Sequence, residues 1–376
     1  MRAVVERAPL LAAVSRLMGV VERRNTIPIL GNICLSLEPG RVRLRATDLE
    51  MEAIEIVVAA VDEPGDITIP ADKFHDIVRN ADPGCQVTIS TSKADPRVVV
   101  QAGRSRFQLP ALPGEDFPTF NADGLSPDWP FPARNLADML SRVAFMRADT
   151  KIITPLNAVY LAVIGDQLTA VACNRSGIAI RNEPAPAGAD LSVMVLPKFI
   201  NQVSRWLGDA DGDAYLSSSA GLLRVVCGNA TLTTKVFDGE YVNYERLLMR
   251  SHEVTATTDQ DALTSAARRV MIMGEVSEGK TRSVKMTFGD GAIRLAAKGS
   301  DTGEGLDEIA ADYEGPERDF LVNAPQMQEA MSNLRGDVVE LSFAKVFDSK
   351  VNSSGQVVIR APSDPAMLIN LMQMRA

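Results

Sequence analysis

Three stretches of the chain repeat one amphipathic pattern at nearly constant spacing. In each stretch four apolar residues stand at relative positions 0, 3, 4 and 7, which places their side chains on one stripe of an α-helix. The three sets are Leu10, Ala13, Val14 and Leu17; Leu136, Met139, Leu140 and Val143; and Leu263, Ala266, Ala267 and Val270. The spacing predicts three equivalent helices distributed over the whole chain.

A second helix is predicted at a fixed distance after each first one. Its apolar stripe starts at Phe74, Phe199 or Met327, and the step from the start of the preceding helix is 64, 63 and 64 residues. The stripes continue with Ile77 and Val78, with Val203 and Trp206, and with Ala330, Met331 and Leu334. Three copies of a two-helix unit of about 125 residues fill the chain, and we expect domains at 1–122, 123–250 and 251–376.

Between the predicted helices, apolar and polar residues alternate as in half-buried strands. Residues 33–37 and 41–45 have this pattern, and residues 285–288 and 292–295 have it on either side of a Gly-Asp-Gly turn. A proline-rich stretch at 112–130 and residues 249–252 mark the domain boundaries. The expected fold is therefore α+β, with three similar domains that each pack two helices on antiparallel sheets.

Composition limits the class of protein. Apolar residues make up 46% of the chain, yet no apolar run approaches the roughly 18 residues of a membrane span. The N-terminal residues contain no apolar signal segment, so we expect a cytoplasmic protein without a membrane partner. Two histidines and four scattered cysteines (Cys34, Cys85, Cys173 and Cys227) give no basis for a metal site, a disulfide framework or His-based catalysis.

A charge pattern repeats with the helices. Each first helix carries an arginine six residues after its first apolar anchor, namely Arg16, Arg142 and Arg269, and two second helices carry Lys73 and Lys198 just before theirs. The formal net charge of −9 argues against a general polyanion binder but leaves room for one basic surface. The row of cations is therefore either a solvated helix face or a surface that faces phosphates.

Three local motifs could carry chemistry, and none has the required context. Residues 274–281 match the phosphate-binding P-loop pattern, but a helix is predicted before them and a strand after them, the reverse of what that loop requires. Asp209, Asp211 and Asp213 lack the glycine and glutamate of a calcium-binding loop. Asp48 and Glu50 have no nucleophile or metal partner nearby. We expect a protein that is not an enzyme and needs no cofactor, with a nucleotide-dependent enzyme as the catalytic alternative.

Five segments carry a family resemblance. They are residues 27–32 (IPILGN), 46–52 (ATDLEME), 103–107 (GRSRF), 116–118 (DFP) and 372–375 (MQMR). They resemble the bacterial β sliding clamp of DNA polymerase III, and the similarity covers the full length. The resemblance implies a head-to-tail homodimer of six domains, a ring that encircles duplex DNA near the nucleoid. It also implies that the ring tethers DNA polymerase subunits, the clamp loader and repair proteins, and that DNA is contacted through phosphates without sequence preference.

The resemblance places residues on the DNA side and at the subunit interface. A tyrosine pair of the family is replaced by Thr154 and Pro155, for which Arg147 and Lys151 are expected to substitute electrostatically. With the recurring helix cations, the expected DNA-binding residues are Arg16, Arg24, Lys73, Arg142, Arg147, Lys151, Lys198 and Arg269. At the interface, Arg104, Phe107 and Leu109 of one subunit are expected to meet Ile272, Met273 and Glu304 of the partner subunit.

The pocket that would bind partner peptides departs most from the family. Residues 173–178 read Cys-Asn-Arg-Ser-Gly-Ile where the family typically has Thr-Asp-Gly-His-Arg-Leu. The expected pocket residues are Leu156, Cys173, Arg175, Ser176, Ile178, Val242, Arg246, Leu247, Asn323, Gln326, Met372, Gln373, Met374 and Arg375. An apolar floor is retained and the rim is changed, which predicts altered specificity. Two functions stay open, a processivity factor for the replicative polymerase and an accessory clamp for a dedicated, phage or plasmid system.

Overall fold

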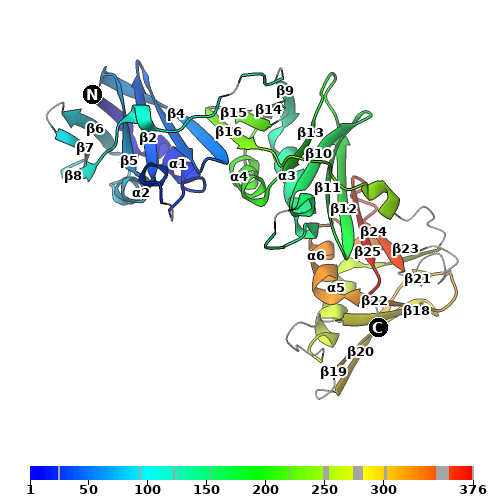
Figure 1. Ribbon diagram of the computed structural model, residues 1–376. Coiled ribbons are helices and arrows are strands. Elements are labelled where there is room, and N and C mark those ends of the chain that lie inside the picture. The colour runs from blue at the N-terminus through cyan, green and yellow to red at the C-terminus, as the bar shows by residue number, and fades with distance from the viewer. Residues whose placement is uncertain are drawn as a thin grey trace. The chain divides into compact units, whose positions relative to one another are not determined.

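The computed structural model describes the elements of all three repeats (Figure 1). The described residues are 1–23, 26–92, 95–121, 123–126, 128–152, 154–219, 221–248, 254–273, 283–299, 303–343 and 355–374. The first repeat contains β1 (Arg2–Glu6), α1 (Arg7–Leu17), η1 (Pro28–Gly31), β2 (Asn32–Glu38), β3 (Arg41–Thr47), β4 (Met51–Glu63), β5 (Gly65–Pro70), α2 (Ala71–Asn80), β6 (Gln86–Ser92), β7 (Asp95–Ala102), β8 (Ser105–Pro110) and η2 (Gly114–Asp116).

The second and third repeats follow the same order. The second contains β9 (Trp129–Pro132), α3 (Ala133–Val143), η3 (Ala144–Met146), η4 (Pro155–Asn157), β10 (Val159–Ile164), β11 (Gln167–Asn174), β12 (Gly177–Pro184), β13 (Ser192–Val195), α4 (Pro197–Leu207), β14 (Asp213–Ser218), β15 (Leu222–Cys227), β16 (Ala230–Lys235) and η5 (Tyr244–Leu247). The third contains β17 (Val254–Asp259), α5 (Gln260–Val270), β18 (Ser283–Gly289), β19 (Ala292–Gly299), β20 (Gly303–Ala310), β21 (Asp312–Tyr313), β22 (Arg318–Asn323), α6 (Ala324–Ser332), β23 (Val338–Phe343), β24 (Gln356–Arg360) and β25 (Met367–Met372).

The helix stripes read from the sequence form the cores. Leu10, Ala13, Val14 and Leu17 of α1 are at most 1% exposed, and the corresponding residues of α3 and α5 are buried as well. Phe74, Phe199 and Met327 anchor α2, α4 and α6 and are 0%, 1% and 1% exposed. The six predicted helices are therefore confirmed, and α1 lies beside α2 as α5 lies beside α6. The sheets they cover are antiparallel throughout, which confirms the α+β fold.

Strand pairing continues from one repeat into the next. The last strand of the second repeat, β16, pairs antiparallel with β4 of the first, and the last strand of the third, β25, pairs with β12 of the second. Over the described residues the result is a 12-stranded sheet, a 9-stranded sheet and a 4-stranded sheet. By contacts the chain separates into two compact units, residues 1–138 with 198–238 and residues 139–197 with 239–376. The middle repeat contributes to both units because its two sheets each join a neighbour's sheet.

Candidate DNA and partner-binding sites

Two of the three recurring helix arginines bind an acid on their own sheet. Arg16 of α1 forms an ion pair with Glu55 of β4, whose side chain is 1% exposed, and its Nη2 donates to Glu55 Oε2 at 2.8 Å. The hydrogen bond to Glu55 raises the pKa of Arg16 further above its ordinary value. Arg269 of α5 donates from Nε to Asp307 Oδ2 at 2.6 Å, and this bond lowers the pKa of Asp307. Both guanidinium groups therefore tie a helix to a strand.

The third arginine, Arg142 of α3, is buried, and the expectation that it faces DNA is wrong. It is 6% exposed and forms an ion pair with Asp364, which is 7% exposed. Its Nε also donates to the carbonyl oxygen of Asn333, the C-cap residue of α6, at 2.7 Å. A charge at this depth is stable only because it is paired and hydrogen-bonded. A helix period locates such a residue on a flank but gives no depth, which is why the sequence misplaced it.

The predicted DNA-binding lysines differ in whether an acidic side chain pairs with them. Lys198 of α4 donates to Asp48, which is 8% exposed on its side chain, and approaches Glu22 at 3.9 Å. Lys73 of α2 is exposed, and none of the ion pairs among the described residues involves it. Lys151 is exposed next to Ile152, which is 77% exposed.

Two further predicted DNA-binding positions have their own surroundings. Arg147 donates to the carbonyl oxygen of Asn157 at 3.4 Å, and burial lowers its pKa. Arg24 lies outside the described residues. Thr154 and Pro155, which stand in place of the family's tyrosine pair, start η4. Thr154 forms a capping box with Asn157, so these two positions serve local folding.

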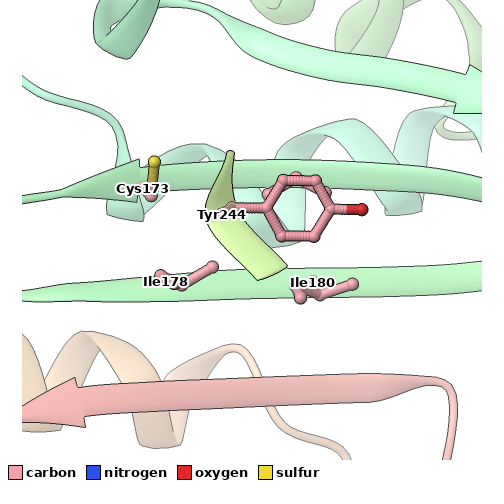
Figure 2. Packing of buried hydrophobic residues seen from close by; sticks show 5 residues of the cluster. Cys173, Ile178, Ile180 and Tyr244 are labelled. Atoms are coloured by element: carbon pink, nitrogen blue, oxygen red, sulfur yellow. The ribbon is translucent and has the colours of Figure 1, made fainter. Parts of the chain in front are cut away.

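An apolar floor lies where the peptide pocket was predicted. Val171 and Cys173 of β11, Ile178 and Ile180 of β12, and Tyr244 of η5 form one buried cluster. Figure 2 shows Cys173 on the upper strand, Ile178 and Ile180 on the lower strand, and the Tyr244 ring between them in this view. Leu156, Val242 and Leu368 pack against it, partly buried. The structure thus places an apolar cluster of β11, β12 and η5 where the floor of the pocket was predicted.

A tyrosine pair that the sequence did not reveal supports this floor. The rings of Tyr160 and Tyr241 stack with centroids 5.1 Å apart and planes 9° apart, and both pack on the cluster. The hydroxyl of Tyr241 lies 3.4 Å from the thiol of Cys173, and burial raises the pKa of both groups. No sequence motif marks the pair, because the two tyrosines are 81 residues apart (160 to 241) and meet only through the fold.

The rim of the floor carries two exposed arginines. Arg175 lies in the turn between β11 and β12, and Arg246 lies in η5 next to Leu247, which is 42% exposed. Ser176 is half-buried, and its carbonyl oxygen accepts the N–H of Met372 at 2.8 Å. The structure therefore brings the rim residues of β11, β12, η5 and the C-terminal strand together within one compact unit.

Gly177 has no room for a side chain. A Cβ atom there would lie 2.6 Å from the carbonyl oxygen of Asn370 and 3.1 Å from the Cε atom of Met146. Met146 also accepts a hydrogen bond at its sulfur from Nε2 of Gln326, at 3.0 Å. Gly177, which stands where the family typically has an arginine, and Gln326 thus both lie against Met146. Restoring the arginine alone would force β12 away from β25.

The C-terminal residues of the pocket are held by backbone bonds. Met374 donates from its N–H to the carbonyl oxygen of Leu321 at 2.8 Å, and Gln373 donates to that of Gly355 at 2.7 Å. Asn323 caps α6 by accepting from the N–H of Gln326 at 3.1 Å. Arg375 lies outside the described residues.

The predicted interface residues of the first repeat lie on an exposed strand edge. Among the described residues β8 pairs only with β7, so its other edge is open. Arg104 and Phe107 are exposed, Phe107 by 39%, and Leu109 is half-buried. Beside Phe107, a hollow of about 250 Å³ separates β8 from the end of α2.

The predicted counterpart in the third repeat is also an open edge. Within the described part of the chain β20 pairs only with β19. Ile272, after the end of α5, is 77% exposed, and Leu306 of β20 is 73% exposed. Glu304 is exposed on the same strand and Met273 is half-buried. Leu306 was not predicted, although its place between acidic residues on an edge strand could have indicated it.

Three further features concern metal binding, membrane crossing and the P-loop-like stretch. Among the described residues, no group of three or more His, Cys, Asp or Glu side chains is placed to hold a metal ion. None of the helices in the described ranges is long and apolar enough to cross a membrane. The P-loop-like stretch at 274–281, which was predicted from sequence to be a false match, lies outside the described residues.

Comparison with known proteins gives the family. Models described as the N-terminal, central and C-terminal domains of the DNA polymerase III beta subunit match residues 1–121, 131–243 and 245–375. The beta sliding clamp of Caulobacter vibrioides is 35% identical over 381 residues, which cover 100% of both chains. That of Pseudomonas aeruginosa is 29% identical over 373 residues, covering 98% of this chain and 99% of the relative.

Solved structures agree with the sequence comparisons. The crystal structure of the DNA polymerase sliding clamp from Caulobacter crescentus has a TM-score of 0.92 at 35% identity and covers 100% of both chains. A sliding clamp from Bartonella birtlesii, bound to griselimycin, has a TM-score of 0.91 at 27% identity and also covers 100% of both chains. The chain therefore belongs to the DNA polymerase III beta subunit family and consists of three clamp domains of α+β fold.

Proposed function

We propose that this protein is a processivity factor for DNA replication. Two copies close head to tail into a ring around duplex DNA, and the ring tethers DNA polymerase. It also binds the clamp loader and repair proteins, through short peptides that enter the pocket of the second and third domains. It acts in the cytoplasm, at the nucleoid, and carries out no catalysis of its own. The relatives named as sliding clamps over their full length support this function.

One observation carries the proposal. The same strand pairing occurs at both domain boundaries inside the chain. The second strand of a hairpin in one domain, β4 or β12, pairs with the last strand of the next domain, β16 or β25. The two strands left over by this rule are β20 and β8, and both have an open edge. With a second copy, β20 of each chain can pair with β8 of the other chain. Every domain boundary then has the same strand pairing, and the two chains form a closed ring.

Burial supports the same closure. By strand register, Phe107 of β8 is equivalent to Leu232 of β16 and Ile369 of β25. Leu232 is 2% exposed and Ile369 is 0% exposed, because each is covered at a boundary, whereas Phe107 is 39% exposed. In the proposed dimer, β20 of the partner subunit covers Phe107, with Gly305 of the partner subunit opposite it. Ile272 of the partner subunit enters the hollow beside Phe107. Charges agree, because Arg104 directly precedes β8 and Arg106 lies on it, while β20 carries Glu304 and Glu308.

The DNA contact rests on fewer residues than the sequence indicated. Arg16, Arg269 and Lys198 already have acidic partners, so their charges are partly neutralised. Lys73 and Lys151 are exposed and supply phosphate contacts in the described part of the chain. Arg24, outside that part, stays a predicted contact. A small number of phosphate contacts suits a ring that must slide.

An accessory clamp for a dedicated partner is the second candidate, and the pocket rim supports it. Ser176 and Gly177 stand where the family typically has histidine and arginine, and Gly177 has no room for a side chain. We expect weak binding of the common glutamine-led clamp peptide and tighter binding of a peptide from a dedicated partner. Titration of both peptides against the wild type and the Ser176→His variant tests this. The substitution is made at position 176 because Gly177 has no room for a side chain. Equal, tight binding by both proteins would identify an ordinary replicative clamp.

Primer extension tests the main proposal. On a primed single-stranded circle, a replicative polymerase and clamp loader from a related bacterium should make much longer products when this protein is present. Phe107→Arg should abolish the gain because the ring cannot close. Unchanged product length with the wild type would contradict the proposal.

A further inference from the structure

The sheet of the first repeat has an apolar row on the face that α1 leaves uncovered. Helix α1 packs against β3 and β4 and covers their buried residues, among them Leu44 and Val57. Successive side chains of a strand point to opposite faces, so the alternate residues of β4 lie on the face away from α1. Those residues are Ile54, Ile56 and Val58, of which the first two are half-buried and Val58 is 79% exposed. An exposed aliphatic row of this kind marks a candidate interaction surface.

A row of arginines on β3 runs beside the aliphatic row of β4. Each aliphatic residue has an arginine directly opposite it in the strand register, on the same face of the sheet. The pairs are Val58 with Arg41, Ile56 with Arg43, and Ile54 with Arg45. Neighbouring strands are about 4.8 Å apart and alternate residues of one strand about 6.8 Å apart. These six residues therefore form two parallel rows, one apolar and one cationic, which we call the arginine–aliphatic face.

The arginines of this face have few acids around them. Arg41 and Arg43 share the carboxylate of Glu38, with N–O distances of 2.6 and 3.3 Å. Arg45 takes part in none of the ion pairs among the described residues, and its Nε has no hydrogen-bond acceptor there. Glu52, the next residue of the β4 row, is 5% exposed and is therefore closed to a ligand. The three arginines carry more positive charge than these two acids balance, so the face favours an acidic ligand.

A hollow of about 720 Å³ adjoins the face at Arg45. It lies between β5 and the segment that follows β8, and Ile67 and Leu112 are among its apolar lining residues. Asp66 and Glu115 also line it. The hollow therefore suits an apolar or basic side chain of a ligand whose acidic groups lie on the arginines.

We propose that the arginine–aliphatic face binds an acidic amphipathic helix of a partner protein. Residues four apart on an α-helix are about 6 Å apart along its axis and form a stripe, at nearly the spacing of the arginines. A second stripe, three residues further along the helix, lies beside the first. Acidic side chains of one stripe can therefore meet the arginines of β3 while aliphatic side chains of the other meet β4. This site would be additional to the proposed peptide pocket.

Single-stranded nucleic acid is the other ligand with regularly spaced negative charges. Proteins that bind it stack its bases on aromatic side chains. The row beside the arginines consists of two isoleucines and a valine, which offer no such platform. The composition of the face therefore favours a helical peptide over a nucleic acid.

Fluorescence anisotropy with a labelled peptide tests the proposal. The probe contains four Glu-Ala-Ala-Leu repeats, which put glutamate and leucine on neighbouring helical stripes. A second probe has lysine in place of glutamate, and a labelled oligothymidylate tests for nucleic acid. The wild type should bind the glutamate peptide roughly tenfold more tightly than the lysine peptide, and less tightly as salt is raised. A benzophenone group on the glutamate peptide should cross-link to residues 54–58.

Two variants remove parts of the face. Val58→Glu replaces an aliphatic contact with a repelling charge, and it should weaken binding of the glutamate peptide on the order of tenfold. Arg41→Gln with Arg43→Gln removes two cations and should weaken it roughly fivefold. The exposure of Val58 makes folding of the first variant the expected result, and if it does not fold, the arginine double variant decides.

Matched controls make the same changes elsewhere. Ile164→Glu replaces an aliphatic residue of β10 that is 42% exposed. Arg2→Gln with Arg134→Gln removes two exposed arginines that each pair with one aspartate. Both controls change the net charge as the test variants do, and both should bind the glutamate peptide as tightly as the wild type.

Several results would overturn the proposal. One is equal affinity of the wild type for the glutamate and lysine peptides, and another is test variants that bind as tightly as their controls. Cross-links to residues 173–180 in place of 54–58 would put the probe in the proposed peptide pocket. Binding of the oligothymidylate but not of the glutamate peptide, lost in the same two variants, would assign the face to nucleic acid.

Discussion

At the scale of single residues, equivalent positions in the three domains have different surroundings and different roles. Arg16, Arg142 and Arg269 stand at one helical position, yet one is half-exposed, one is buried and one is exposed. What decides the outcome is the residue opposite each arginine on the sheet, which the helix pattern does not contain. A repeated cation is therefore weak support for a DNA-binding surface until its partner is known.

Gly177 provides a stability prediction. Gly177→Ala places a Cβ 2.6 Å from the Asn370 carbonyl oxygen, so β12 and β25 must move apart. We expect a loss of about 1–3 kcal/mol in the free energy of unfolding. Urea unfolding measures it, and Ser176→Ala, at the half-buried neighbour, should change stability by less than about 0.5 kcal/mol. Equal stability of Gly177→Ala and the wild type would show that the pairing is looser than described.

Glu52 provides a pH prediction. It is 5% exposed, and burial raises its pKa, opposed by a backbone bond from Phe120 and by nearby arginines. Between the unfolded and the raised native pKa the native state binds more protons, so this group's contribution to stability is lost as pH rises. Glu52→Gln should therefore melt higher than the wild type near about pH 8, with the difference shrinking near about pH 4. The exposed control Glu115→Gln should show no such trend, and a lower melting point for Glu52→Gln at the higher pH would refute the argument.

At the scale of elements, sequence patterns located helices better than strand edges. The stripes beginning at Leu10, Leu136 and Leu263 were sufficient to place α1, α3 and α5, since a helix period is local. The pairings of β4 with β16 and of β12 with β25 join residues far apart in sequence, and alternation carries no information about partners. For the same reason Asp364 and the Tyr160–Tyr241 stack were not predicted. The pocket residues that were predicted came from family resemblance and not from periodicity.

Strand register predicts where the two subunits can be cross-linked. Carrying the register of the internal boundaries over to β8 and β20 sets Arg104 opposite Glu308 of the partner subunit and Gln108 opposite Glu304 of the partner subunit. Cross-strand neighbours have Cβ atoms about 4.5–5.5 Å apart, close enough for a disulfide after a small adjustment. Arg104→Cys with Glu308→Cys should give a covalent dimer on mild oxidation. Arg104→Cys with Glu304→Cys, displaced by about 13 Å along the strand, should not. The reverse result would mean that the register differs from that of the internal boundaries.

At the scale of the whole molecule, three sequence repeats and two compact units describe the same chain. The repeats are defined by their similar series of helices and strands. The two compact units arise because strands pair across both repeat boundaries. Among the described strands, β8 and β20 are the two that this pairing across repeat boundaries leaves without a partner on one edge. The proposed closure by a second copy would pair both edges.

DNA retention should depend on the free cations and not on the paired ones. Lys73→Glu should reduce the salt-dependent slope of DNA binding by about 0.9 for the phosphate contact it removes and should not alter folding. Lys235→Glu makes the same charge change on strand β16, away from the helix flank, and serves as control. Lys198→Glu is less suitable because it would leave the buried Asp48 beside a second acid. Equal slopes for Lys73→Glu, Lys235→Glu and the wild type would remove Lys73 from the DNA surface.

Retention on a closed DNA circle is the most direct test of the ring. The protein is loaded onto nicked circular duplex DNA with a clamp loader and separated from free protein by gel filtration in high salt. Half of the sample is then cut once with a restriction enzyme. A ring that encircles DNA stays with the intact circle and is lost from the linear molecule, because it slides off the ends. Equal retention on both, or retention that high salt alone abolishes, would mean that the protein binds DNA without encircling it.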